Sequence, residues 1–130
     1  MIIKITPDIQ KAQALVKMAE ITLERLEKTE ISEYPSNTLV DYYDIIHKLL
    51  EAIALREGTK AKGEGAHQEL IEYIVKYLKL DEQTRQFLQQ LRDYRNRISY
   101  EGFMVQENFI ITNQEKIKSI IEKLNKNLNL

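Results

Sequence analysis

Three arginines and two tyrosines are concentrated in the segment 92–102, which reads RDYRNRISYEG. Arg95 has the most unusual position, because it follows Leu91 by four residues and precedes Ile98 by three. On a helix these offsets put Arg95 at the margin of the apolar face and not on the solvent side. We therefore expect a partly buried guanidinium group that needs polar partners.

Two kinds of partner are compatible with this position of Arg95. In the first, Arg95 pairs with a carboxylate such as Glu101, while Asn96 and Tyr100, one turn apart, form a hydrogen bond at the helix end. In the second, Arg95 and Asn96 bind a phosphate group, to which arginine offers a planar fork of donors. Tyr100 then donates a hydrogen bond to the phosphate or stacks on a base. The residues alone leave both alternatives open.

The same segment resembles the signature of the HEPN domains, small helical-bundle proteins found as prokaryotic toxins and beside minimal nucleotidyltransferases. That signature is an arginine, often followed by asparagine, with a histidine four to six residues after the arginine, late in a bundle helix. Arg95 and Asn96 match it in type and spacing, and Tyr100 stands where the family has histidine. The resemblance covers residues 36–102, because a tyrosine pair, an apolar stripe, a glycine-containing loop and a histidine precede the motif.

This resemblance implies metal-independent cleavage of RNA, in which a base activates the ribose 2′-hydroxyl, an acid protonates the leaving oxygen and arginine stabilises the phosphorane. It also implies a two-fold dimer with both copies of the motif around one cleft. Such a dimer suits a motif whose ends, five residues apart, lie about 140° apart around a helix. The implied catalytic residues are Arg95, Asn96 and Tyr100. The flanking Arg92 and Arg97 are the implied RNA-binding residues.

Tyr100 puts catalysis itself in doubt. Histidine suits proton transfer because its pKa of about 6.5 lies near the working pH. Tyrosine, with a pKa of about 10, is a poor general base at pH 7. We therefore predict a protein that binds RNA or a nucleotide, is related to RNase toxins of toxin-antitoxin systems, and cleaves weakly or not at all. The alternative is a non-enzymatic helical module that docks a partner protein, such as a small nucleotidyltransferase acting as antitoxin.

The two histidines each follow a carboxylate by three residues, in the pairs Asp44 and His47, and Glu64 and His67. Di-iron bundles use paired Glu-x-x-His motifs. Here one carboxylate is an aspartate and the other pair lies at the edge of a glycine-containing loop, so we predict no metal and no other cofactor. We expect His47 to be partly buried and hydrogen-bonded within the bundle. We expect His67 to be a cap or first-turn residue that could approach Arg95.

Composition limits the remaining classes of function. Cysteine is absent, which excludes disulfides, thiolate zinc sites and a cysteine nucleophile, and suits a reducing compartment. The sequence has neither a signal-peptide pattern nor an apolar run near the length of a membrane span, so we expect a cytoplasmic protein with no membrane partner. With a formal net charge of −1, the protein as a whole does not attract a polyanion. RNA binding would therefore need a local basic patch.

Helical periodicity recurs along the chain, and glycine (4) and proline (2) are rare. We predict an all-α, up-and-down bundle of about five helices in one domain, residues 1–130, with a HEPN-like fold. We expect a homodimer, because five helices in a small bundle leave one surface uncovered. The expected helices cover about residues 7–30, 36–57, 66–78, 82–101 and 113–128.

Three segments at the ends of the expected helices or between them have sequence patterns that predict their structure. Thr6 is the expected cap of the first helix, with the proline after it at the first helical position. The segment Lys60–Gly65, KAKGEG, is the expected mobile loop. Phe103–Ile111 is apolar but aperiodic, which favours an extended connection before a last helix capped by Thr112 or Asn113.

Overall fold

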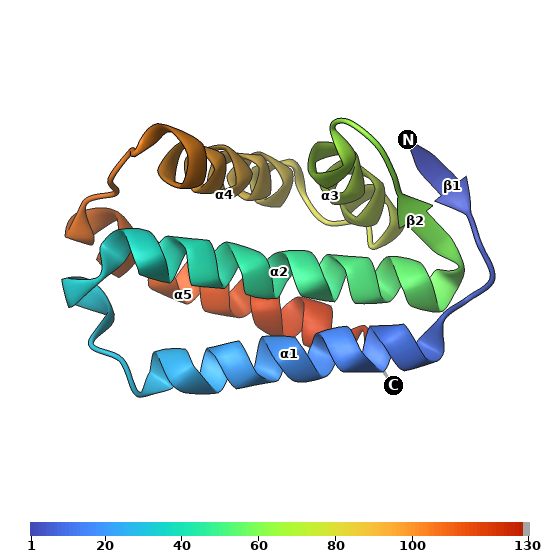
Figure 1. Cartoon of the computed structure of the whole chain (residues 1–130), viewed down its shortest axis with the longest axis horizontal. Helices are drawn as coiled ribbons and strands as arrows, with labels where there is room; N and C mark the ends of the chain where they lie inside the picture. The colour runs from blue at the N-terminus through green and yellow to red at the C-terminus, as the bar shows by residue number, and fades with distance from the viewer. Residues whose placement is uncertain (129–130) are drawn as a thin grey trace.

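The computed structural model describes residues 1–128, and within them five α-helices form a bundle (Figure 1). The helices are α1 (Ile9–Glu27), α2 (Pro35–Glu57), α3 (Ala66–Tyr77), α4 (Glu82–Glu101) and α5 (Glu107–Lys126). The smaller elements are a 3-10 helix, η1 (Ile31–Glu33), and two short strands, β1 (Ile2–Lys4) and β2 (Thr59–Ala61). The predicted all-α bundle of five helices is therefore confirmed.

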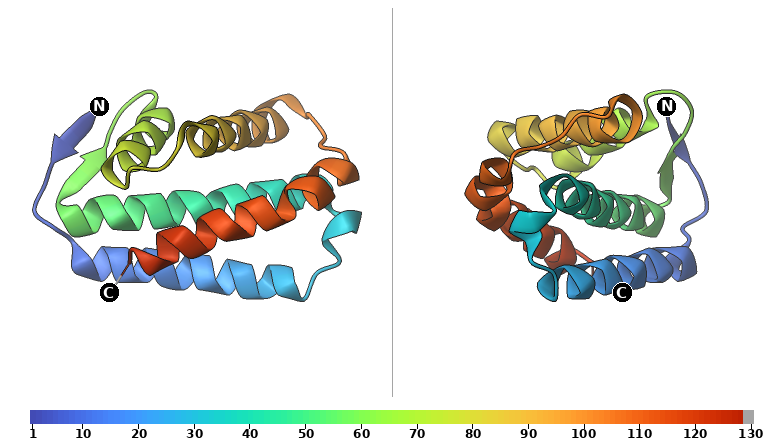
Figure 2. Two further views of the ribbon diagram at one scale, coloured as in Figure 1. Left: turned by 180° about the vertical axis from the view of Figure 1, so that it is seen from behind. Right: turned by 60° about the vertical axis from the view of Figure 1, so that its left-hand side comes forward.

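Helix α2 is the centre of the bundle. Helices α3 and α4 cover one side of it, and α1 and α5 cover the other (Figures 1 and 2). Residues 52–55 of α2 are buried at four consecutive positions, which an amphipathic surface helix would not allow. Asp44 and His47, two polar residues of α2 in the candidate site, are partly buried.

The two strands were not expected. They pair antiparallel, with Ile2 opposite Ala61, so Lys60 and Ala61 belong to a strand and only residues 62–65 remain a loop. The prediction of a loop over the whole segment was wrong because the N-terminal strand supplies backbone partners. A Thr-Lys-Ala sequence gives little sign of such pairing.

Helix α1 starts later than expected, after Asp8. The Asp8 carboxylate accepts a hydrogen bond from the Lys11 N–H at 3.0 Å and is the N-cap. Thr6 does not cap the helix because the chain before it is tied to the end of α2, where the Ile5 N–H donates to the Gly58 carbonyl at 2.9 Å. The structure therefore replaces one plausible cap by another two residues away.

Helix α5 begins at Glu107, more than a turn before its expected cap. Ile110 and Ile117 are both fully buried, and a separation of seven residues puts them on one face of a helix. The expected later start was wrong because the apolar pattern extends further toward the N-terminus than the sequence suggested. The connection after α4 is short, and its Val105 N–H donates to the Ser36 hydroxyl at 2.9 Å.

Candidate nucleic-acid interface

Arg95 lies in the last third of α4 and points toward α2. Its side chain is 23% exposed, and its Nε lies 3.9 Å from Oδ1 of Asp44 on α2. That distance is too long for a hydrogen bond, and within residues 1–128 this Nε is a buried donor with no hydrogen-bond partner. The predicted position of Arg95 at the margin of the buried face is confirmed, and its need for a partner is only partly met.

Asn96 is the one side chain that hydrogen-bonds Arg95 in the described part of the chain, accepting from Nη1 at 3.3 Å. The carboxylate that pairs with Arg95 is Asp44, so the pairing with Glu101 that the sequence allowed is not formed. Nor does a hydrogen bond join Asn96 to Tyr100 among residues 1–128. Arg95 is therefore held by one long ion pair and one neutral contact, and it keeps donors for a ligand.

Tyr100 lies on the surface beside this arginine. It is 76% exposed, and the centre of its ring is 5.9 Å from Cζ of Arg95. An exposed aromatic face next to a guanidinium group suits stacking on a base better than it suits proton transfer.

Arg92 and Arg97 differ in their surroundings. Arg92 donates from Nε to Oε1 of Gln89 at 2.7 Å, and its positive charge acts on His67. The guanidinium of Arg97 lies 4.1 Å from the ring centre of Phe103 and 3.9 Å from Oδ2 of Asp93. The structure thus brings Arg92 to the candidate site and packs Arg97 against the connection between α4 and α5.

Two histidines and a tyrosine form a second part of the site that the sequence did not predict as a unit. His47 on α2 and His67 on α3 stack with ring centres 3.8 Å apart and planes 16° apart. The hydroxyl of Tyr43, one turn before His47, lies 3.1 Å from Nδ1 of His67. Tyr43 is fully buried, and both histidines are partly buried. His67 is in the first turn of α3, as expected.

Burial and nearby positive charges lower the pKa of both imidazoles. Burial is the main cause that lowers the pKa of His47 to about 4, and the neighbouring His67 adds to it. Burial also lowers the pKa of His67, followed by the positive charge of Arg95, while Glu51 acts in the opposite direction. Burial raises the pKa of the Tyr43 phenol far above its usual range. His67 and Arg95 therefore lie within electrostatic reach of each other, as the sequence allowed.

One sequence signal could have found this part of the site. Tyr43 and His47 are four residues apart on α2 and must share a helix face. His67 follows the chain reversal after α2, so its stacking on His47 depends on how α3 packs. That packing cannot be read from spacing. The sequence therefore indicated that Tyr43 and His47 lie on one helix face, but not that His67 stacks against them.

The imidazoles also line a small pocket of about 210 Å³, together with Glu51 and Lys60. Its volume is sufficient for several water molecules or a small anion. Within residues 1–128, no three His, Cys, Asp or Glu side chains are grouped so that they could hold a metal ion.

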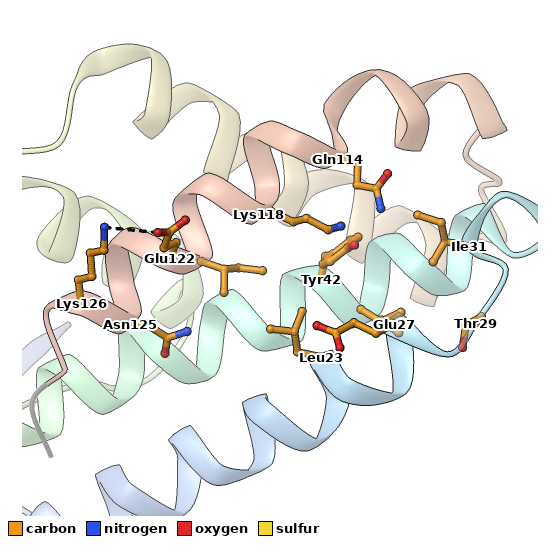
Figure 3. Close-up of a pocket in the computed structure, with 12 residues that line it drawn as sticks. Leu23, Glu27, Thr29, Ile31, Tyr42, Gln114, Lys118, Glu122, Asn125 and Lys126 are labelled. Atoms are coloured by element: carbon orange, nitrogen blue, oxygen red, sulfur yellow. Dashed lines mark ion pairs between the residues drawn. The ribbon is translucent and has the colours of Figure 1, made fainter.

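A larger groove, of about 680 Å³, lies on the other side of α2 between α1 and α5 (Figure 3). Its floor contains the buried side chains of Leu26, Tyr42 and Ile121. At its rim Lys126 pairs with Glu122 at 3.3 Å (Figure 3). Among the described residues, two lysines, Lys118 and Lys126, and neither a histidine nor an arginine line this groove.

In the described residues, no helix has both the length and the apolar character that crossing a membrane requires. Comparisons with protein-family models, curated proteins and solved structures find no match to this chain. The likeness to HEPN domains therefore remains a resemblance in motif and fold class.

Proposed function

We propose that this protein is HEPN-like and binds phosphate groups of RNA or of a nucleotide at the site between α2, α3 and α4. The observation that carries this proposal is the buried Nε of Arg95, which has no acceptor within residues 1–128. A buried donor without an acceptor costs roughly 1–3 kcal/mol. A phosphate oxygen would remove that penalty and would form a charge-assisted hydrogen bond.

The charges around Arg95 favour an anion. Asp44 is the only carboxylate paired with Arg95 among the described residues, at 3.9 Å. Arg92 adds a second positive charge, and the neutral His47 and His67 add no negative charge. With Lys60 at the neighbouring pocket, three positive charges stand against the two carboxylates Asp44 and Glu51, which supports a modest local basic patch of the kind that RNA binding requires.

The surroundings of this basic site favour single-stranded RNA among the nucleic acids. The exposed ring of Tyr100 lies beside Arg95, and unpaired bases stack on such rings while arginine contacts the adjoining phosphate. We therefore use single-stranded RNA as the first ligand to test, and a mononucleotide as the second.

The test is the affinity of a fluorescein-labelled single-stranded RNA, measured by fluorescence anisotropy at fixed salt for the parent protein and for Arg95→Ala. Arg85→Ala is the matched control, because Arg85 is on the same helix and is paired with Glu72 and Glu82. We expect Arg95→Ala to weaken binding by about 1–3 kcal/mol and Arg85→Ala to leave it nearly unchanged. Equal affinities of the parent and Arg95→Ala would contradict the proposal.

In this proposal the protein is related to metal-independent RNase toxins, and its own cleavage of RNA is slow or absent. The support is the exposed Tyr100 at the position where the family has its histidine. A toxin of this kind acts where cellular RNA is accessible, so the proposal places the protein in the cytoplasm.

The proposal includes a homodimer. Arg95 and Tyr100 of one protomer lie side by side, and a two-fold axis would bring a second copy of this pair to the same cleft. The test is sedimentation equilibrium at micromolar concentration. We expect a species of twice the chain mass, and a single species of 15.3 kDa would contradict the dimer.

A non-enzymatic docking module is the second candidate function, and one observation favours it. Three large side chains near the connection between α4 and α5 are exposed to solvent: Tyr100 in α4, Met104 in the connection and Ile111 in α5. A partner such as a small nucleotidyltransferase acting as antitoxin could cover them. Co-expression of such a partner with Met104→Glu and Ile111→Glu variants tests this, because a docking role predicts loss of the complex without loss of RNA affinity.

A further inference from the structure

The hydrogen bond between Tyr43 and His67 determines where the His67 ring carries its proton. Tyr43 is fully buried, and Nδ1 of His67, at 3.1 Å, is the one hydrogen-bond partner of its hydroxyl within residues 1–128. Burial raises the pKa of the phenol, so the hydroxyl keeps its proton. If Nδ1 donated instead, that buried hydroxyl proton would have no acceptor, which is unfavourable. Tyr43 therefore donates to Nδ1, and the proton of the neutral ring is on Nε2.

The direction of this N–H group follows from the same contacts. Nδ1 points to the buried Tyr43, and Nε2 leaves the ring away from it. His47 stacks on one face of the His67 ring at 3.8 Å, which fixes the ring plane. His67 is only partly buried and lines the small pocket between α2, α3 and β2. The neutral ring thus carries a donor, and not a lone pair, at Nε2, the nitrogen that Tyr43 leaves free.

The charged groups that face His67 come from three elements. Arg92 and Arg95 on α4 are positive, and Asp44 and Glu51 on α2 are negative, as the effects of their charges on the His67 pKa show. Lys60 on β2 lines the pocket beside the ring. The positive charges thus come from two elements. Two hydrogen-bond donors at this place, Nε of Arg95 and Nε2 of His67, have no protein acceptor within residues 1–128.

We infer that His67 is a second phosphate ligand of the Arg95 site, that its Nε2–H donates to a phosphate oxygen, and that Tyr43 is the positioning residue that holds this tautomer. This inference rests on the proposed function, because it names a further ligand of the same anion. A phosphodiester in RNA and free inorganic phosphate share this chemistry, and the two are separate arms of the test.

The first measurement is the tautomer of His67, read from two-bond ¹H–¹⁵N correlations of the ¹⁵N-labelled protein at pH 7. We expect the Nε2–H form in the parent protein and a mixture of tautomers in Tyr43→Phe, which keeps the ring of Tyr43 and removes only the hydroxyl. An Nδ1–H tautomer in the parent protein would overturn the inference whatever the protein binds.

The second measurement is affinity for labelled single-stranded RNA and, by chemical-shift titration, for inorganic phosphate. We expect His67→Ala to weaken RNA binding about fivefold, the usual effect of one neutral hydrogen bond. His67→Gln should restore most of that loss, since its amide N–H₂ extends about as far as Nε2. Arg85→Ala is again the control, because Arg85 lies outside the site and is paired with Glu72 and Glu82, and it should bind as the parent does. Circular dichroism checks that each variant is folded.

The outcomes separate this inference from the proposed function. If Arg95→Ala loses RNA affinity and His67→Ala does not, the inference fails and the RNA site stands. If the parent binds no RNA but phosphate shifts the His67 signals, the inference stands and the RNA function fails. If neither ligand shifts Arg95 or His67, both are wrong.

Discussion

Replacing Arg95 with methionine should stabilise the folded protein while it weakens RNA binding. The Nε of Arg95 is buried and unpartnered within residues 1–128, and its ion pair with Asp44 is long, at 3.9 Å. Methionine keeps an unbranched apolar chain that can fill the same space and has no donor to satisfy. If Arg95 serves ligand binding and not the stability of the fold, replacing it removes the free-energy cost of burying a donor without an acceptor.

The expected magnitude follows from these two contacts. The unsatisfied donor costs roughly 1–3 kcal/mol, and its removal returns that amount. The Asp44 carboxylate is 39% exposed, and losing an ion pair of this kind costs about 0–1 kcal/mol. The net change is a gain of about 1–2 kcal/mol in the free energy of unfolding. Each kcal/mol corresponds to roughly 3–6 °C in Tm for a domain of this size.

The assay is urea unfolding followed by circular dichroism at pH 7, with Arg85→Met as the matched control. Arg85 has hydrogen-bonded carboxylate partners in Glu72 and Glu82, so Arg85→Met should be neutral or slightly destabilising. A loss of more than about 1 kcal/mol in Arg95→Met would show that Arg95 is a structural ion-pair residue. That result would refute the reasoning from the orphaned donor.

Three further predictions concern the same fold and site. His47 has a pKa lowered to about 4 and the unfolded chain binds its proton near pH 6.5, so stability present above pH 6.5 is lost as the pH falls toward 4. Between pH 7 and pH 4.5, the free energy of unfolding of His47→Phe, measured with urea, should therefore fall by about 2–3 kcal/mol less than that of the parent. An identical fall in both proteins would contradict the burial of His47. Gly58→Ala should destabilise by about 1–3 kcal/mol in the same assay, because φ is +80° and a Cβ would lie 2.9 Å from the Ile5 carbonyl oxygen; a neutral effect would show that the chain there relaxes freely. Tyr100→His should keep RNA affinity within about twofold and raise metal-independent cleavage, since it adds a group that titrates near neutral pH; gel-based cleavage assays measure this, and brisk cleavage by the parent that is lost in Tyr100→Phe would show that tyrosine itself is the catalyst.

Helix periodicity was sufficient to predict the bundle, because each apolar stripe must be covered by another helix. The boundaries were less predictable where tertiary hydrogen bonds decide them. Asp8 replaces Thr6 as a cap because Ile5 is tied to Gly58, more than fifty residues away in the sequence. The pairing of β1 with β2 is likewise a contact between distant segments that no local pattern encodes.

The candidate site was likewise predictable where it depends on one helix and unpredictable where it depends on contacts between helices. The partial burial of Arg95 follows from its offsets to neighbouring apolar residues on one helix. Its actual carboxylate partner, Asp44, is on another helix, and the stacking of His47 on His67 depends on the packing of α3 against α2. Spacing within a helix therefore predicts which residues leave the apolar face, and only the packing of helices decides what they meet.

The most direct test of the account is the Nε–Hε signal of Arg95 in ¹⁵N-labelled protein during titration with single-stranded RNA. The account predicts that this signal shifts as Nε, which has no acceptor in the free protein, gains a phosphate acceptor, while the paired Arg85 signal stays in place. If RNA saturates the protein and shifts other signals while the Nε–Hε signal of Arg95 does not move, the central claim is wrong.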